Sequence, residues 1–272
     1  MAKTLPNGRG FWVWHLGDCC GGDAAALAAH CQAHGITWLA IKWLSVHGAQ
    51  QLTANVVATL QTAGVDVFGW RYDLPGDAAG IAQAARAVAG TGARGYIIDA
   101  EIEWESAANP DAAARATVAA LAAAGLPADF VVAHAPFDVI ANHQAFPYTA
   151  LGEGCDFVSP QAYWSEHGIS EAASTARVLA QWSAYRQKHP QACKALVPSG
   201  YSVQPDLAGG KLPTPADMLH FEATCAAAGC AAVAFWRFDG TPDATWQALA
   251  GTAYPQAVAG TCADADAAAP GC

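Results

Sequence analysis

The stretch Gly95-Tyr96-Ile97-Ile98-Asp99-Ala100-Glu101-Ile102-Glu103 is typical of a β-strand that is apolar at its start and acidic at its end. Side chains alternate between the two faces of a strand, so Asp99, Glu101 and Glu103 are predicted to share the face of Ile97. Such a strand fills a core with its lower part and opens into a site with its upper part. Two carboxyl groups this close do not ionise together easily, so one is expected to have a raised pKa and to suit general-acid chemistry.

Short β-branched or aromatic runs alternate along the chain with Ala-rich segments of helical period, which is typical of repeated βα units. The predicted strands cover residues 11–16, 37–43, 65–72, 95–101, 130–133, 156–163, 195–201 and 231–238. The clearest predicted helices cover residues 23–34, 52–63, 78–89, 111–124, 171–188 and 215–228. Several of these helices end at a glycine, namely Gly35, Gly64, Gly125 or Gly229, which is the usual αβ-loop chemistry of a parallel sheet.

Eight such units in 272 residues predict a single (β/α)8 barrel, because this fold typically needs about 250 residues. We place the barrel domain at residues 1–254 and a flexible C-terminal tail at residues 255–272, which are rich in Ala, Gly and Asp. A doubly wound open sheet is the structural alternative. The absence of a Gly-rich phosphate fingerprint favours the closed barrel over it.

The composition excludes several classes of partner. Hydrophobic residues make up 53% of the chain, but no apolar run approaches the roughly 20 residues of a membrane span, so no membrane insertion is expected. A net charge of -10 without a Lys/Arg cluster disfavours nucleic acid. The N-terminus lacks the apolar run of a secretory signal, so we expect a protein that is cytoplasmic at synthesis and that would reach a cell wall only by a route other than secretory export. We also expect it to be a monomer.

The cysteine pattern predicts neither a metal nor a cofactor. None of the nine cysteines shows paired CxxC spacing, and no HExxH motif is present. Disulfides are conceivable within the pairs Cys19 and Cys20, Cys225 and Cys230, and Cys262 and Cys272. We expect most cysteines to be reduced, because Ala-rich chains without a secretory signal can bury thiols as small hydrophobic groups.

Barrel enzymes place their reactive groups where strands end, and here these positions are unusually aromatic and polar. Aromatic platforms combined with carboxylates are typical of carbohydrate sites, although some of these tryptophans are expected only to cap the barrel mouth. Glu103 lies farther into the loop, and two interpretations of it stay open: a residue of the site, or a solvated loop residue paired with a basic side chain. The strand-end residues expected to contact substrate are Trp236, Trp70, Trp164, Gln161, Glu103, Arg71, Lys42 and His15.

Three segments carry a resemblance to known families. The Asp99-Ala100-Glu101 strand resembles the DxE strand of barrel glycoside hydrolases, both the family 25 lysozymes and the family 18 chitinases. The segment SPQAYW at residues 159–164 resembles the sixth-strand segment that carries a tyrosine in chitinase-like barrels. The segment VAFW at residues 233–236 resembles their eighth-strand tryptophan segment.

This resemblance implies that Glu101 protonates the glycosidic oxygen and that Asp99 and Tyr163 hold the 2-acetamido arm of the substrate. Trp236 would stack under the sugar ring. The implied mechanism is substrate-assisted, with the acetamido oxygen as nucleophile. The chain departs from both patterns, since Arg94 and Ile97 stand where chitinases carry further acids, and His15 stands where family 25 carries an aspartate.

The leading functional hypothesis is therefore a glycoside hydrolase that cleaves an N-acetylhexosamine-containing polymer, either peptidoglycan, as a phage-type lysin would, or a chitin-like glycan. The alternative is a non-catalytic glycan-binding barrel, in which the same acids only bind sugar hydroxyl groups. A third hypothesis, an enzyme that uses Lys42 as a Schiff-base amine on a substrate other than sugar, stays open.

Overall fold

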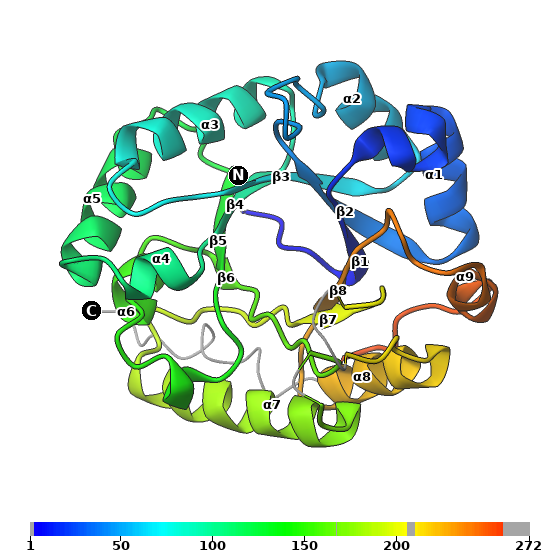
Figure 1. Cartoon of the computed structure of the whole chain (residues 1–272). Coiled ribbons are helices and arrows are strands. Elements are labelled where there is room, and N and C mark those ends of the chain that lie inside the picture. Colours follow the sequence, from blue (N-terminus) through cyan, green and yellow to red (C-terminus); the bar gives the residue numbers. More distant parts are fainter. Residues whose placement is uncertain (1–2, 167, 206–209, 258–272) are drawn as a thin grey trace, which may run out of the picture.

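The computed structural model describes residues 3–166, 168–205 and 210–257, and these form a ring of parallel strands surrounded by helices (Figure 1). The expected (β/α)8 architecture is confirmed. The strands are β1 (Gly8–Val13), β2 (Ile36–Lys42), β3 (Asp66–Tyr72), β4 (Gly95–Asp99), β5 (Val131–Ala135), β6 (Phe157–Val158), β7 (Ser199–Tyr201) and β8 (Ala232–Trp236). The α-helices are α1 (Ala24–Ala33), α2 (Ala54–Thr62), α3 (Ala78–Gly90), α4 (Ile102–Glu105), α5 (Pro110–Ala122), α6 (Tyr148–Gly152), α7 (Glu171–Lys188), α8 (Pro215–Ala227) and α9 (Asp243–Leu249).

All neighbouring strands of the sheet are parallel, in the order β6-β5-β4-β3-β2-β1-β8-β7. Parallel bridges between Val158 and Leu196 and between Gln161 and Ser199 link the two edge strands. Strands β6 and β7 are shorter than predicted. Each predicted strand contains a proline, Pro160 or Pro198, which has no N–H group to donate to the ladder.

The interior of the barrel is filled mainly by aromatic rings. The ring centroids of Trp38 and Phe68 are 5.7 Å apart, and those of Phe68 and Phe157 are 6.1 Å apart, which makes a layer near the bottom of the barrel. Gly10 makes room for this layer, because a Cβ atom at Gly10 would lie 2.0 Å from the Trp38 ring. The inner face of the strands is therefore a packed core, as expected of this fold.

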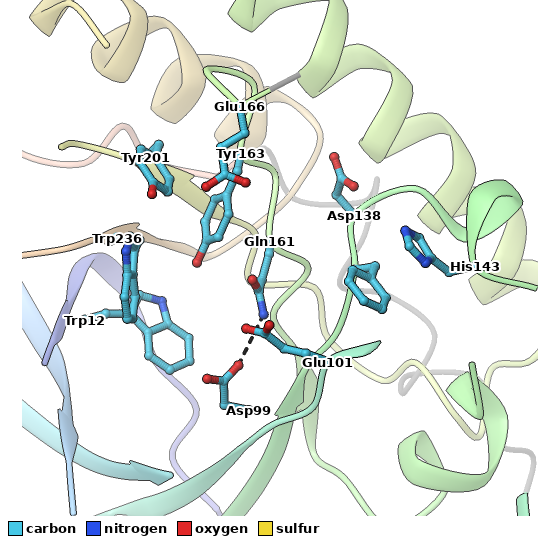
Figure 2. A pocket seen from close by; sticks show the side chains of 11 residues that line it. Trp12, Asp99, Glu101, Asp138, His143, Gln161, Tyr163, Glu166, Tyr201 and Trp236 are labelled. Carbon is cyan, nitrogen blue, oxygen red and sulfur yellow. Dashed lines mark hydrogen bonds between the residues drawn. The ribbon is translucent and has the colours of Figure 1, made fainter. Parts of the chain in front are cut away.

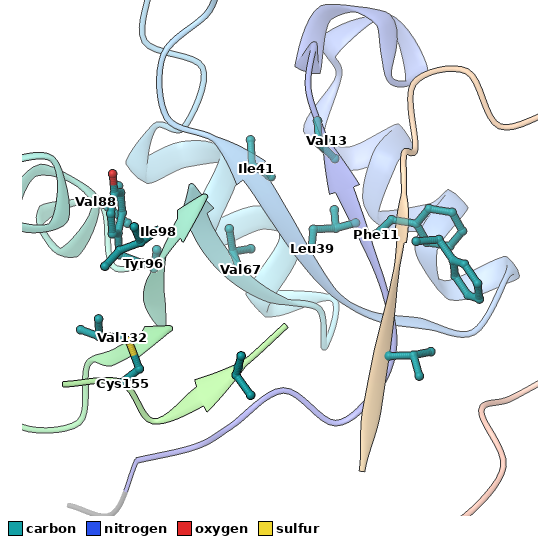
Figure 3. Packing of buried hydrophobic residues seen from close by; sticks show 14 of the residues in the cluster. Phe11, Val13, Leu39, Ile41, Val67, Val88, Tyr96, Ile98, Val132 and Cys155 are labelled. Carbon is teal, nitrogen blue, oxygen red and sulfur yellow. The ribbon is translucent and has the colours of Figure 1, made fainter. Parts of the chain in front are cut away.

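A second core lies between the strands and the helices (Figure 3). The alternate residues of each strand point outward into it, as Phe11, Leu39, Val67 and Ile98 do. Burial on both faces explains why the strands are nearly continuous apolar runs. Among the residues of the described chain, no helix has both the length and the apolar character that a bilayer span requires.

The lower end of the barrel is held by a buried ion pair. The guanidinium of Arg9 on β1 donates to Glu222 on α8, with an Nη2 to Oε2 distance of 2.8 Å, and both side chains are almost fully buried. Arg9 also donates to the backbone oxygens of His34 and Thr252. The hydroxyl of Tyr254 donates to the backbone oxygen of Cys230 at 2.7 Å, so the chain packs on the barrel up to the predicted domain end.

Seven cysteines lie in the described part of the chain, and no disulfide joins any two of them: Cys19, Cys20, Cys31, Cys155, Cys193, Cys225 and Cys230. Six of these thiols are buried, and burial raises the pKa of Cys19, Cys31 and Cys155 well above the usual value. The remaining candidates, Cys262 and Cys272, lie outside the described residues, as does most of the predicted tail.

The buried ion pair generates a stability prediction. Glu222→Gln should lower the free energy of unfolding by about 3–5 kcal/mol, because it leaves the buried Arg9 guanidinium without a counter-charge. Urea unfolding measures this loss. The matched control is Glu153→Gln, which removes the exposed Arg115–Glu153 pair and should cost under about 1 kcal/mol. Equal losses in the two variants would contradict the role assigned to Arg9.

Candidate active site

A cavity of about 430 Å³ opens at the barrel mouth, at the carboxyl ends of the strands (Figure 2). Side chains from β1, β4, β7 and β8 contribute to its walls, together with the segments that follow β4, β5 and β6. The lining residues are Trp12, Asp99, Glu101, Phe137, Asp138, His143, Gln161, Tyr163, Glu166, Tyr201 and Trp236. Of the residues predicted from sequence, the structure brings Asp99, Glu101, Gln161, Tyr163 and Trp236 together here.

Asp99 and Glu101 lie in the middle of the cavity, but they belong to different local structures (Figure 2). Asp99 is the last residue of β4 and is 7% exposed. Glu101 directly precedes the short helix α4. Trp104 anchors that helix, since its indole N–H donates to the backbone oxygen of Asp73 at 2.6 Å. The fixed helix in turn fixes the backbone from which Glu101 reaches the cavity.

Burial raises the pKa values of both acids. Loss of solvation raises the pKa of Asp99 well above its usual range, the nearby charges of Glu101 and Asp73 raise it further, and Lys42 opposes the shift. Loss of solvation also raises the pKa of Glu101, with Gln161 opposing and Glu103 and Glu166 adding to the shift. Both groups therefore hold a proton at pH values where an exposed carboxylic acid has lost it.

The segment after β6 places two polar side chains over the acids. The Gln161 amide donates to Asp99 Oδ1 at 3.2 Å and to the backbone oxygen of Ala135 at 3.3 Å. Tyr163 packs against Tyr201, with ring centroids 4.7 Å apart. Burial raises the pKa of Tyr163 well above its usual value, so its phenol remains a hydrogen-bond donor.

Three packed tryptophan rings make up the floor of the cavity: Trp12 and Trp236 line it, and Trp70 packs against both. The Trp12 and Trp70 centroids are 5.4 Å apart, the Trp70 and Trp236 centroids 5.6 Å, and the Trp12 and Trp236 centroids 6.4 Å. The indole N–H of Trp12 donates to Ser199 Oγ at 2.9 Å, and the hydroxyl of Ser159 lies 2.8 Å from that of Ser199. This buried polar chain fixes the tilt of the Trp12 ring.

Two of the predicted sugar-binding tryptophans do not line the cavity. Trp70 is 1% exposed and lies beneath the other two rings of the floor. Trp164 is 3% exposed and packs against Phe221 of α8, with centroids 5.3 Å apart, on the outer side of the barrel. The structure therefore places both rings outside the cavity lining, which Trp12 and Trp236 provide instead.

Glu103 and Arg71 are also placed away from the cavity. The predicted alternation stops at Asp99, where β4 ends, and Glu103 lies inside α4 and accepts a hydrogen bond from the Tyr72 hydroxyl. Arg71 forms ion pairs with Asp73 and, at 2.9 Å, with Asp77. Glu103 therefore pairs with the last residue of β3, and Arg71 pairs with the loop that follows this strand.

Lys42 and His15 lie beside the floor and are not among the lining residues. The Lys42 ammonium nitrogen is 5.2 Å from the Trp14 ring centroid and 5.0 Å from that of Trp70. Loss of solvation lowers the pKa of Lys42, and the charge of Asp99 opposes this shift. His15 stacks on Trp14, with centroids 5.2 Å apart. Lys42 thus contacts the floor ring Trp70, whereas His15 contacts only the neighbouring Trp14 among the aromatic rings of the described residues.

Sequence reasoning did not assign six of the lining residues to the site: Trp12, Phe137, Asp138, His143, Glu166 and Tyr201. Trp12 and Tyr201 could have been found, because Trp12 shares the strand face of Trp14, and Tyr201 closes β7. The other four lie in loops, whose positions the strand pattern does not determine. Within the described ranges, no group of three or more His, Cys, Asp or Glu side chains is arranged to hold a metal ion.

Comparison with models of known protein families gives no match, and comparison with curated protein sequences gives none either. Solved structures of similar fold do exist. Active domain 2 of a chitinase from Pyrococcus furiosus, complexed with chito-oligosaccharides, superposes with a TM-score of 0.66 at 11% identity, covering 91% of this chain and 94% of that one. A GH18 chitinase from Pseudoalteromonas aurantia gives a TM-score of 0.60 at 13% identity, covering 88% and 97%.

The spore cortex-lytic enzyme SleL from Bacillus cereus gives a TM-score of 0.58 at 12% identity, covering 89% of this chain and 73% of that one. The resemblance found in the sequence thus extends to the whole fold, which this chain shares with chitinases and related barrel glycoside hydrolases. At such low identities the likeness concerns the fold.

The raised pKa of Asp99 predicts a gain in stability on its neutralisation. Such an acid binds more protons folded than unfolded, so the free energy of unfolding falls as the pH rises from about 4, the unfolded pKa. Asp99→Asn removes this dependence. The free energy of unfolding of the variant, relative to that of the native protein, should therefore rise by at least about 1 kcal/mol between about pH 4 and pH 8. Denaturant unfolding at both pH values measures the gain. A stability difference independent of pH would contradict the raised pKa.

Proposed function

We propose that this protein is a glycoside hydrolase that cleaves polymers containing N-acetylhexosamine at the barrel mouth. The observation that carries the proposal is the position of Glu101, an acid with a raised pKa, beside buried Asp99 in the cavity that Trp12 and Trp236 also line. Aromatic surface with a few converging polar groups suits a sugar ring, and a carboxylic acid that keeps its proton suits cleavage of a glycosidic bond.

Glu101 acts as the general acid. Its proton passes to the glycosidic oxygen as the bond between that oxygen and the anomeric carbon breaks. The acetamido oxygen of the same sugar forms a bond to the anomeric carbon and gives a cyclic intermediate. Water then opens this intermediate, and the Glu101 carboxylate takes up the proton that the water loses, which restores the acid and retains the configuration.

Asp99 and Tyr163 orient the acetamido group for this attack. Asp99 accepts from the acetamido N–H while Gln161 holds its carboxyl group from the other side. The Tyr163 hydroxyl donates to the acetamido oxygen, which its raised pKa allows over the whole physiological range. Positioning of this kind turns a flexible arm of the substrate into a preorganised nucleophile.

The solved structures of similar fold support the choice of substrate class. One is a chitinase domain complexed with chito-oligosaccharides, and another is described as a spore cortex-lytic enzyme. Chitin-like glycans and peptidoglycan both carry N-acetylhexosamine, and the proposal includes both; action on peptidoglycan would make the protein a lysin. The chain would act as a monomer on a polymer held across the mouth.

Glu101→Gln should reduce hydrolysis of a chito-oligosaccharide by about a hundredfold or more, because the amide keeps the shape of the side chain and has no proton to transfer. The matched control is Glu103→Gln, which lies two residues away and outside the lining. This control should stay active, with the basic limb of its pH profile moved to lower pH, since the Glu103 charge raises the pKa of Glu101. Full activity of Glu101→Gln would show that Glu101 is not the general acid.

A thiazoline mimic of the cyclic intermediate tests the role of Asp99. The native protein should bind the mimic far more tightly than the corresponding free sugar, and Asp99→Asn should lose most of this preference. Calorimetric titration measures both affinities. A 2-fluoro sugar that labels Asp99 or Glu103 covalently would instead show a carboxylate nucleophile. Binding of oligosaccharide without any turnover would favour the non-catalytic glycan-binding barrel.

A further inference from the structure

The cavity continues beyond Glu101 to a second wall, which is built by the segment between β5 and α6. Phe137, Asp138 and His143 form this wall. Figure 2 shows Asp138 and His143 on the opposite side of the Asp99–Glu101 pair from Trp12 and Trp236, and Phe137 stacks on His143. Neither the strand pattern nor the DxE resemblance points to these three residues. This wall can therefore have a binding role that differs from the role of the two acids.

The second wall is anchored at several points. Phe137 forms a parallel bridge with Gln161, and the Gln161 N–H donates to the Pro136 oxygen at 3.0 Å. The indole N–H of Trp182 on α7 donates to the Asp138 backbone oxygen at 2.9 Å. The segment thus has a defined shape before any ligand arrives, as most binding sites do.

Two contacts fix the orientation of the His143 imidazole ring, one with Phe137 and one with Glu105. Its ring stacks on Phe137, with centroids 3.7 Å apart and an angle of 10° between the planes. Its Nδ1 lies 2.7 Å from Oε2 of Glu105, and His143 and Glu105 are 25% and 20% exposed. An ionised carboxylate only accepts, so Nδ1 donates, and Nε2 is the ring nitrogen that can bond a ligand.

The position of the acid divides the cavity into two parts. If Glu101 protonates the glycosidic oxygen, that oxygen lies beside Glu101, and the two sugars that it joins lie on opposite sides. The sugar with the reacting anomeric carbon takes the side of Asp99, Tyr163 and Trp236. The leaving sugar must then lie against the wall of Phe137, Asp138 and His143.

We propose that Phe137, Asp138 and the His143–Glu105 pair form the subsite for the leaving sugar, in which His143 Nε2 and the Asp138 carboxyl group bond hydroxyl groups of that sugar. This inference rests on the proposed function, because the assignment of sides depends on Glu101 being the acid. His143 is a binding residue here and takes no part in proton transfer to the glycosidic oxygen. The subsite makes the protein select substrates whose leaving group is a sugar.

Two substrates that differ only in the leaving group test the subsite. The leaving group of chitotetraose is a sugar. The leaving group of 4-nitrophenyl chitobioside is 4-nitrophenol, which lacks the ring hydroxyl groups that a sugar presents to the second wall. His143→Ala should lower kcat/KM on chitotetraose by about five- to tenfold, the effect of one lost hydrogen bond, and should change kcat/KM on the aryl substrate by less than about twofold. Glu105→Gln should act in the same direction with a smaller effect.

The chain offers a matched control in His220, which pairs with Glu171 between α8 and α7 and does not line the cavity. His220→Ala should leave the ratio of the two activities unchanged. Equal losses on both substrates in His143→Ala, with an unchanged melting temperature, would place His143 in the chemistry and overturn the subsite. Equal activity of the variant and the native protein on both substrates would also overturn it.

Assays of the native protein distinguish a failure of the proposed function from a failure of the subsite. If the native protein cleaves neither substrate, the affinities of chitobiose, chitotriose and chitotetraose decide. The subsite holds if the longer sugars bind the native protein more tightly and lose that advantage in His143→Ala. It fails if the affinity does not depend on length, or if the variant keeps the same dependence.

Discussion

The contact among the Trp12, Trp70 and Trp236 rings is the interaction on which the cavity depends. These rings come from β1, β3 and β8, and they close the barrel interior about one layer above the Trp38–Phe68 pair. Because the interior below is packed, the space above becomes a cavity with an aromatic floor, and Asp99 at the end of β4 lines it. Without this layer Asp99 would face a void or water, and its pKa would not be raised by burial.

The electrostatics of the mouth follow from where each charge is placed. Asp99 is buried at the floor, Glu101 stands at its edge, and Glu103 and Glu166 surround the pair with further negative charge. Lys42 opposes the upward shift of the Asp99 pKa, and its ammonium nitrogen lies 5.2 Å from the Trp14 ring centroid and 5.0 Å from that of Trp70. The net effect keeps protons on the two central acids, at the expense of stability at neutral pH, and the proton on Glu101 is the one that general-acid chemistry requires.

The repeating pattern was sufficient to predict the barrel, and α7 was predicted to the residue, because strand and helix periods and the glycine-ended helices depend on local sequence. Asp99 and Glu101 were predictable for the same reason. The alternation itself ends at Asp99 with β4, and Glu103 lies inside α4 instead of on the predicted strand face. The burial of Trp164 and the loop position of His143 depend on contacts distant in sequence, with Phe221 and Glu105, which no local pattern encodes.

The central claim is that Glu101 lies at the scissile bond, between a sugar on the tryptophan floor and a sugar on the His143 wall. A crystal structure of Glu101→Gln with chitotetraose tests it most directly. The account predicts one pyranose ring stacked on Trp236, the next against His143, and the linking oxygen within hydrogen-bonding distance of residue 101. An oligosaccharide bound wholly on one side of residue 101, or bound outside the cavity, would contradict it.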